Sequence, residues 1–192
     1  MEYLTVGTKE ILNDLFIPVT DKLVNSVKPY GGLWLTEYDS KYKNYNVWVD
    51  FLINNPDILF YKSHSSNIWC QPCSLVTLKE NANIFKLESD SSLEYLLNNY
   101  QLNNGRFSYQ SLSHNYDGIY VDITKLIRNA KHPIITQCIK EYGVSSLLLF
   151  NLACIDYYIP GSVLIEPFDL EYYMYENGGY EITHEKVKKK IK

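Results

Sequence analysis

The chain has 192 residues, of which 46% are hydrophobic and 21% are charged, and its formal net charge is −4. This composition is that of a packed globular protein and excludes a chain that is disordered throughout. Five lysines lie between Lys186 and Lys192, which leaves 13 of the 18 basic residues against 22 acids, a balance of −9. An acidic body lacks the clustered Lys and Arg that bind phosphate, so nucleic acid is expected to be contacted only through the basic tail.

The first half of the chain alternates between short strand patterns and helical spacing. The residue 45–55 segment predicts a helix because Val47, Phe51 and Asn54 recur near helical spacing before an Asn-Pro break. The expected elements are a strand at 2–8, a helical turn at 9–16, a strand at 31–38, the helix at 45–55, a strand at 57–62 and two strands within 74–89.

The second half begins with the clearest helix, residues 90–100, which has an N-cap and an acid three residues beyond Ser91. A polar loop is expected at 103–114, a strand at 116–123, helices at 124–130 and 133–142, a buried segment of ambiguous type at 145–158, and at 161–175 a strand that becomes helical after Pro167. Strands and helices mix irregularly, so we predict an α+β fold whose sheet is mixed, mainly antiparallel and flanked by helices.

The chain is expected to form one globular domain over residues 1–179, followed by a basic, flexible tail over residues 180–192. The N-terminus shows no signal-peptide pattern, and the longest apolar stretch, Val144 to Ile155, is far shorter than the ~20 residues that span a bilayer. We therefore expect a cytoplasmic protein with reduced thiols and no membrane partner.

Two cysteines lie in the segment Trp69-Cys70-Gln71-Pro72-Cys73. It resembles the W-C-x-P-C site of thioredoxin-like oxidoreductases, where a helix N-terminus lowers the pKa of the first cysteine. Here the next residues alternate like a strand, which favours two reduced cysteines at the entry of a strand. A Cys₄ zinc site is a further reading, but the second C-x-x-C half is missing, so no metal site is predicted.

Three segments in order resemble the ADP-ribosyltransferase fold: Val6-Gly7-Thr8, the run Gly31 to Thr36, and the run Gly161 to Pro167. The stretch Tyr116 to Val121 also resembles a strand of that class, and the Lys28 to Trp34 segment, K-P-x-G-G-L-W, resembles uncharacterised phage and bacterial proteins. The resemblance implies NAD as cofactor, with cofactor-binding and catalytic residues as follows: Gly7, Thr8, Gly32 and Trp34 for binding, and Thr36, Ser162 and Glu166 for catalysis.

Two positions depart from that family's pattern. Val6 stands where the family has His or Arg, and Ser162 stands where its Glu would fall. Glu166 lies four residues further on, about 13 Å along an extended strand, so it does not simply replace the missing acid.

Two further residues, His114 and Asp156, are weaker candidates for a catalytic role. His114 lies three residues before Asp117, and this pair could serve as a general base for Ser111 or Ser113, although a solvent-facing loop histidine is the plainer reading. Asp156 follows a long apolar run, where it either caps the end of a strand or sits in a pocket with a raised pKa.

The tyrosine content favours a recognition surface. The chain contains 18 Tyr, which give large contact area at low entropic cost. Clusters occur around Trp34 and Trp48, at Tyr38, Tyr42 and Tyr45, and late in the chain at Tyr172, Tyr173 and Tyr175. Together with the missing His and Glu and the acidic body, this aromatic surface leads us to expect a non-catalytic protein, an inhibitor from a phage or mobile element that binds a host or defence protein. The alternative is an NAD-dependent ADP-ribosyltransferase, a toxin or effector with atypical catalytic residues.

Overall fold

The computed structural model divides the chain into two compact units. Unit 1 comprises residues 1–12, 36–78 and 155–192, and unit 2 comprises residues 13–35 and 79–154. The residues that the structure describes are 1–21, 27–42, 46–53, 69–102, 105–129, 131–165 and 180–191.

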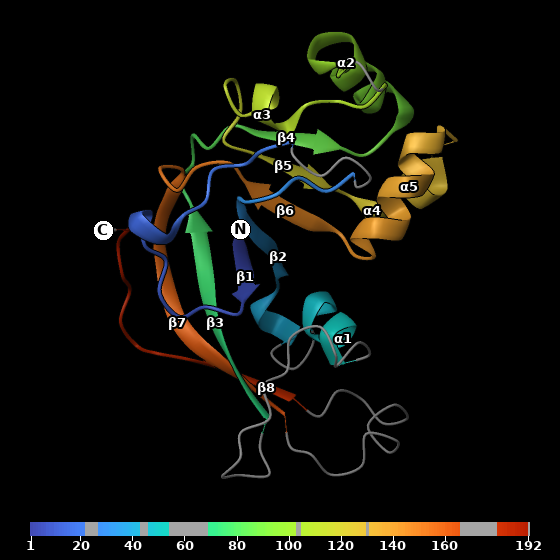
Figure 1. The fold of residues 1–192 in the computed structure, drawn as a ribbon. Coiled ribbons are helices and arrows are strands. Elements are labelled where there is room, and N and C mark those ends of the chain that lie inside the picture. Colours follow the sequence, from blue (N-terminus) through green and yellow to red (C-terminus); the bar gives the residue numbers. More distant parts are fainter. Residues whose placement is uncertain are drawn as a thin grey trace. The chain divides into compact units, whose positions relative to one another are not determined.

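The elements follow one another as a mixture of strands and helices (Figure 1), as an α+β fold requires. In chain order they are β1 (Glu2–Val6), η1 (Asn13–Leu15), β2 (Leu33–Tyr38), η2 (Ser40–Tyr42), α1 (Val47–Ile53), β3 (Trp69–Leu78), β4 (Ile84–Leu87), α2 (Asp90–Tyr100), α3 (Tyr109–Leu112), β5 (Gly118–Val121), α4 (Ile123–Asn129), α5 (Pro133–Tyr142), β6 (Ser146–Leu149), β7 (Ile155–Ile165) and β8 (Tyr180–His184).

The described strands form an eight-stranded sheet in the order β4-β5-β6-β2-β1-β3-β7-β8. Every pairing between them is antiparallel except that of β4 with β5, which is parallel. The predicted α+β class with a mainly antiparallel sheet is therefore confirmed. Within the described residues, none of the helices combines the length and the apolar character that crossing a bilayer requires.

One face of the strands of unit 1 carries its apolar cluster. Leu4 pairs with Leu75, which in turn pairs with Ile159, and residues that pair across a sheet lie on the same face. This face carries the apolar cluster of the unit, to which α1 contributes the buried Val49. The backbone amide of Asn46, just before α1, donates to the hydroxyl of Tyr180 in β8.

The residues after Tyr180, where we expected a basic tail, begin with β8. Further along, Lys189 exchanges backbone hydrogen bonds of 2.8 and 2.9 Å with Tyr158 of β7. Lys190 Nζ lies 2.6 Å from a carboxylate oxygen of Asp156, so this acid is an ion-pair partner at the start of β7. The division into one domain and a tail stays a prediction.

Unit 2 packs helices on strands β4, β5 and β6. The connection from β4 to β5 runs through α2 and α3, as a parallel pair requires. Leu87, Ile119 and Leu148 point to the same buried cluster as Leu93 and Leu96 of α2. This cluster fixes α2 against the sheet and thereby sets the geometry of the residues between β4 and α2.

Several predicted elements differ from the observed ones. The two strands expected within 74–89 are β3 and β4, and they do not pair with each other. The expected loop at 103–114 contains α3, whose N-cap Ser108 accepts from Ser111 N. The ambiguous segment at 145–158 holds β6 and the start of β7. The strand at 57–62 and the helix after Pro167 lie outside the described residues.

Candidate binding groove

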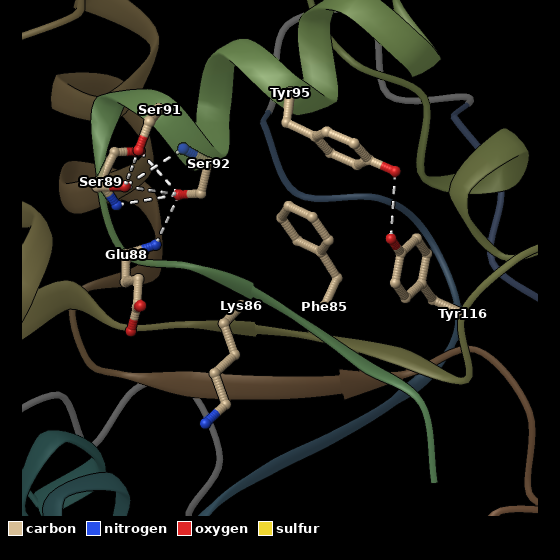
Figure 2. A pocket seen from close by; sticks show the side chains of 8 residues that line it. All are labelled: Phe85, Lys86, Glu88, Ser89, Ser91, Ser92, Tyr95 and Tyr116. Atoms are coloured by element: carbon tan, nitrogen blue, oxygen red, sulfur yellow. Dashed lines mark hydrogen bonds between the residues drawn. The ribbon is translucent and has the colours of Figure 1, made fainter.

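A groove of about 530 Å³ opens in unit 2 between β4, the first turns of α2 and Tyr116, two residues before β5 (Figure 2). We call it the Tyr95 groove. Its lining residues are Phe85, Lys86, Glu88, Ser89, Ser91, Ser92, Tyr95 and Tyr116.

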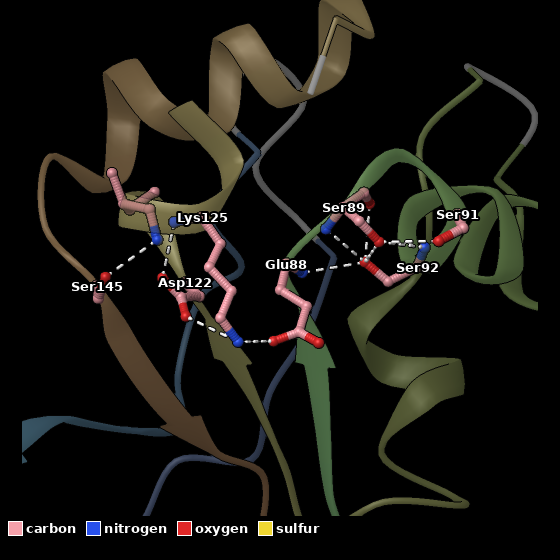
Figure 3. Close-up of polar contacts among 8 residues, drawn as sticks. Glu88, Ser89, Ser91, Ser92, Asp122, Lys125 and Ser145 are labelled. Carbon is pink, nitrogen blue, oxygen red and sulfur yellow. Dashed lines mark hydrogen bonds and ion pairs between the residues drawn. The ribbon is translucent and has the colours of Figure 1, made fainter. Parts of the chain in front are cut away.

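The end of β4 and the start of α2 are held together by a capping box (Figure 3). Ser89 is the N-cap and its hydroxyl accepts from Ser92 N at 3.2 Å. The Ser92 hydroxyl accepts from the amides of Ser89 and Glu88, both at 3.0 Å, and donates to the Ser89 carbonyl at 2.8 Å. The box therefore uses Ser89 and Ser92, whereas the sequence pattern pointed to Ser91 and the acid that follows it.

Aromatic rings form one wall of the groove. Phe85 and Tyr95 are stacked, with ring centroids 5.6 Å apart and planes 15° apart, while Tyr116 meets Phe85 edge-on at 5.3 Å. The hydroxyls of Tyr95 and Tyr116 are 3.4 Å apart, and this hydrogen bond, more than burial, raises the pKa of Tyr116 to about 12. Tyr95 remains 43% exposed, so a large apolar ring is presented to solvent.

Charge in the groove is partly matched within the chain. Lys125 of α4 forms an ion pair with Glu88 and lies 3.6 Å from Asp122 (Figure 3). The hydrogen bond with Glu88 is the main reason that the pKa of Lys125 is raised. Lys86 is exposed and forms no ion pair with any residue that the structure describes, so the unmatched charge of the groove is positive.

Among the strands that the structure describes, β4 is paired on one side only. β4 is the terminal strand next to β5, and the carbonyls of Asn83 and Leu87 accept from the amides of Asp117 and Asp122 on the β5 side. Because alternate residues of a strand direct their backbone groups to opposite sides, the even-numbered residues turn theirs away from β5. The amide of Glu88 follows this pattern and is taken by Ser92.

The serine hydroxyls of the groove are engaged in structural contacts, whereas its aromatic rings are free to bind. A serine nucleophile needs a free hydroxyl with a base within hydrogen-bond reach. The hydroxyls of Ser89 and Ser92 are engaged with backbone groups and with each other, and no His or Cys is among the described residues that line the groove. The wall of rings, by contrast, supplies the apolar contact area that binding sites use.

The register of unit 1 does not bring two of the predicted catalytic residues together. Thr36 pairs with Leu4, Leu4 with Leu75, and Leu75 with Ile159, so all four lie on the same face. Ser162 lies three residues beyond Ile159, an odd step that puts it on the opposite face. Both Thr36 and Ser162 are buried.

The predicted cofactor-binding residues of unit 1 have local roles. Gly7 has φ = 107° and donates its amide to the carbonyl of Pro72 at 2.7 Å, which lets the chain turn at the end of β1. The Thr8 hydroxyl donates to the carbonyl of Glu10 at 2.6 Å and accepts from its amide at 3.2 Å. Glu166 lies outside the described residues.

The other two predicted cofactor-binding residues, Gly32 and Trp34, belong to unit 2. Gly32 has φ = 73°, and a Cβ there would meet the Leu149 carbonyl at 2.9 Å. Trp34 packs edge-on against Tyr142 at 5.5 Å, and Lys28 Nζ lies over both rings at 5.5 and 5.3 Å. Burial lowers the pKa of Lys28. Packing of this kind accounts for the spacing of Lys28, Gly32 and Trp34, and the assignment of NAD-binding roles stays a prediction.

The thioredoxin-like motif lies in an extended strand. Cys70 pairs with Leu164 and Cys73 with Gly161 in the regular ladder between β3 and β7. Three residues of a strand span ~10 Å, whereas the Cα atoms of a disulfide are at most about 7 Å apart. The motif therefore lacks the helix N-terminus and the proximity that redox chemistry requires.

The residues of the proposed His114–Asp117 pair and its serines lie as follows. Asp117 accepts from Asn83 N and from Asn151 Nδ2, both at 2.9 Å, so its carboxylate joins two loops. His114 is exposed, and the Ser113 hydroxyl donates to the Gln110 carbonyl. Over the part of the chain that the structure describes, no group of three or more His, Cys, Asp or Glu side chains could hold a metal ion.

The chain matches no protein-family model, and comparison with curated proteins and with solved structures gave no match.

One residue of α2, Tyr95, is a signal for the groove in the sequence itself. Leu93 and Leu96 form the buried stripe of α2, and Tyr95 stands between them on the exposed side. A large aromatic residue outside the apolar stripe of an amphipathic helix is a candidate for recognition. Of the expected tyrosine clusters, Tyr38 is buried, while Tyr45, Tyr172, Tyr173 and Tyr175 lie outside the described residues, so a surface formed by these clusters stays a prediction.

Proposed function

We propose that the chain is a non-catalytic binding protein and that the Tyr95 groove receives a protein partner. The observation that carries this proposal is the exposed ring of Tyr95, stacked on Phe85 and joined to Tyr116 beside an open strand edge. Tyrosine is enriched among the residues that dominate binding energy, because its ring buries much area and its hydroxyl keeps a polar partner.

Pre-organisation supports the same proposal. The stacking with Phe85 and the hydroxyl contact with Tyr116 hold the Tyr95 ring before any partner arrives. A side chain that is already ordered loses less entropy on binding, which raises affinity for a given contact area. An inhibitor that occludes a host or defence protein would use a surface of this kind.

The test is site-directed photo-crosslinking in extract of the source cells. We would introduce Tyr95→p-benzoylphenylalanine and, as a matched control, Tyr30→p-benzoylphenylalanine, because Tyr30 is also in unit 2 and is 51% exposed. The proposal predicts a protein adduct from position 95 that position 30 does not give. Excess unlabelled wild-type chain should suppress this adduct, and excess Tyr95→Ala should not.

Two results would contradict the proposal. Identical adducts from positions 95 and 30 would show that capture is non-specific. A shift in melting temperature with NAD, abolished by Trp34→Ala, together with no adduct at position 95, would instead favour the NAD-dependent transferase. A ligand at 100 times its Kd adds ~2.7 kcal/mol of stability, so such a shift is measurable.

A further inference from the structure

We infer that the partner segment is an extended peptide that adds as a strand to the free edge of β4 and places an acidic side chain beside Lys86. This inference rests on the proposed function of the Tyr95 groove and names the way in which the partner is recognised. It follows from three properties of the groove: its backbone, its two faces and its unmatched charge.

The backbone supplies the pairing groups. Ile84 and Lys86 are the residues of β4 whose amide and carbonyl turn away from β5, as the bonds of Asn83 and Leu87 toward β5 show. A peptide strand bonds to such an edge through alternate residues, and this β-strand addition is a known mode of peptide recognition. The Ser92 hydroxyl takes the next outward amide, that of Glu88, and so marks the end of the available edge.

The two faces of β4 differ in chemistry. Figure 2 shows Phe85 pointing toward Tyr95 and Tyr116, while Lys86 points away from them on the other side of the strand. A strand added at this edge alternates its own side chains between the same two faces. The residues on the Phe85 face are therefore expected to be apolar, and a residue between them is expected to meet Lys86.

The positive charge of Lys86 favours an acidic residue of the peptide beside it. Glu88 already has Lys125 as its partner, whereas Lys86 has no ion pair among the described residues. Opposite charges on neighbouring strands stabilise pairing and like charges oppose it. β4 itself contains no acid, so a second copy of the chain pairing through the same four residues would supply no counter-charge for Lys86.

The experiment uses defined peptides and fluorescence polarisation. The probe is a blocked, fluorescein-labelled heptapeptide, Thr-Val-Glu-Val-Glu-Val-Thr, and the reference has the same composition with its Val and Glu residues in separate blocks. Strand addition predicts that the alternating peptide binds at least ~10-fold more tightly, a difference of about one hydrogen-bonded or charged contact. Alternate amides of an added strand point toward β4 or away from it. N-methylation of the amides in one alternating set should therefore abolish binding, while N-methylation of the other set should change binding less than ~2-fold.

Variants of the chain test the two faces separately. Tyr95→Ala should weaken binding of the alternating peptide, while Tyr95→Phe, which keeps the ring, should retain most of it. Lys86→Glu should reverse the preference toward a peptide with Lys in place of Glu. Lys140→Glu is the matched control, because Lys140 is an exposed lysine of unit 2 that does not line the groove.

The outcomes separate the two proposals. If both peptides bind equally and both respond to Tyr95→Ala, the groove binds peptides but strand addition is overturned. If neither peptide responds to Tyr95→Ala, or neither binds, both strand addition and the groove as a binding site are overturned. A concentration-dependent dimer that Tyr95→Ala dissolves would assign the groove to a second copy and would also overturn the inference.

Discussion

Replacing Ser92 with Ala perturbs the junction that shapes the Tyr95 groove. The Ser92 hydroxyl accepts from the amides of Glu88 and Ser89 and donates to the Ser89 carbonyl, at distances of 2.8 to 3.0 Å. The substitution removes these three hydrogen bonds and also the longer one, of 3.4 Å, that the Ser89 hydroxyl donates to Ser92. It leaves the N-cap bond from Ser92 N to the Ser89 hydroxyl in place, so the start of α2 is weakened without being abolished.

The size of the effect follows from these contacts. Ser92 is half-buried, so each of the three shorter bonds is placed at the low end of the usual range, ~0.5 kcal/mol, or about 1.5 kcal/mol together, and the 3.4 Å bond is neglected. Alanine regains about 0.5 kcal/mol through its higher helix propensity. The net loss is therefore about 1 kcal/mol, which corresponds to a fall in melting temperature of about 2–4 °C for a chain of this length.

Thermal unfolding and amide hydrogen exchange measure this prediction together. The amides of Glu88 and Ser89 should exchange faster in Ser92→Ala, because both lose their acceptor. Ser91→Ala is the matched control, since the Ser91 hydroxyl contacts only that of Ser89, at 2.9 Å, and its removal should leave stability within about 0.5 kcal/mol. Equal melting temperatures for Ser92→Ala and wild type, with unchanged exchange at Glu88 and Ser89, would refute the reasoning.

Three further predictions concern Gly161, His184 and the buried cysteines. Gly161→Ala should destabilise unit 1 by ~2–3 kcal/mol in denaturant unfolding, because the new Cβ would collide with the Thr183 carbonyl and meet His184 Nδ1 at 2.8 Å. Burial lowers the pKa of His184, so the unfolded state binds more protons below pH ~6.5, and stability should fall as the pH drops through that value. Burial raises the pKa of Cys138 and of Cys154 to about 12, so both thiols should resist alkylation at pH 8 until the chain is unfolded.

A specific result would contradict each of these three predictions. A Gly161→Ala protein with wild-type stability would mean that β7 and β8 do not pair as described. His184→Gln should flatten the fall in stability between pH 7 and the folded pKa, and an unchanged slope would assign it to another group. Rapid native alkylation of Cys138, located by mass spectrometry, would show that its surroundings are open to solvent.

Periodic and capped segments are the part of the fold that the sequence predicts well. The helix over residues 133–142 is α5, with Pro133 in its first turn and Gly143 at its C-cap with φ = 71°. Proline at the start and glycine at the end are local preferences that act without tertiary context. The helix over 90–100 is also confirmed. Its start is fixed by a local capping preference, although the capping residue is Ser89.

Burial and non-local pairing account for what the sequence did not predict. All four residues of β6, Ser146 to Leu149, are buried, so the strand shows none of the alternation that identifies a half-exposed strand. The parallel pairing of β4 with β5 joins residues more than 30 positions apart, and no local pattern specifies it. That pairing brings Tyr116 beside Phe85, so the groove could not be assembled from neighbouring residues.

The glycine and tryptophan of the Lys28 to Trp34 segment show how a packing signal can resemble a binding signal. Gly32 is required by a positive φ and by the closeness of Leu148 and Leu149, and Trp34 by its contacts with Lys28 and Tyr142. Sequence alone does not distinguish a glycine that admits a ligand from one that admits a neighbouring strand.

Hydrogen exchange of the chain with and without its crosslinking-identified partner is the most direct test of the central claim. Occupation of the Tyr95 groove predicts slower exchange in the peptide that covers residues 84–95, and no slowing in a control peptide from α5, residues 133–142. The same partner should protect Tyr95→Phe but not Tyr95→Ala. A partner that binds with full affinity and leaves residues 84–95 exchanging at the free rate would contradict the account.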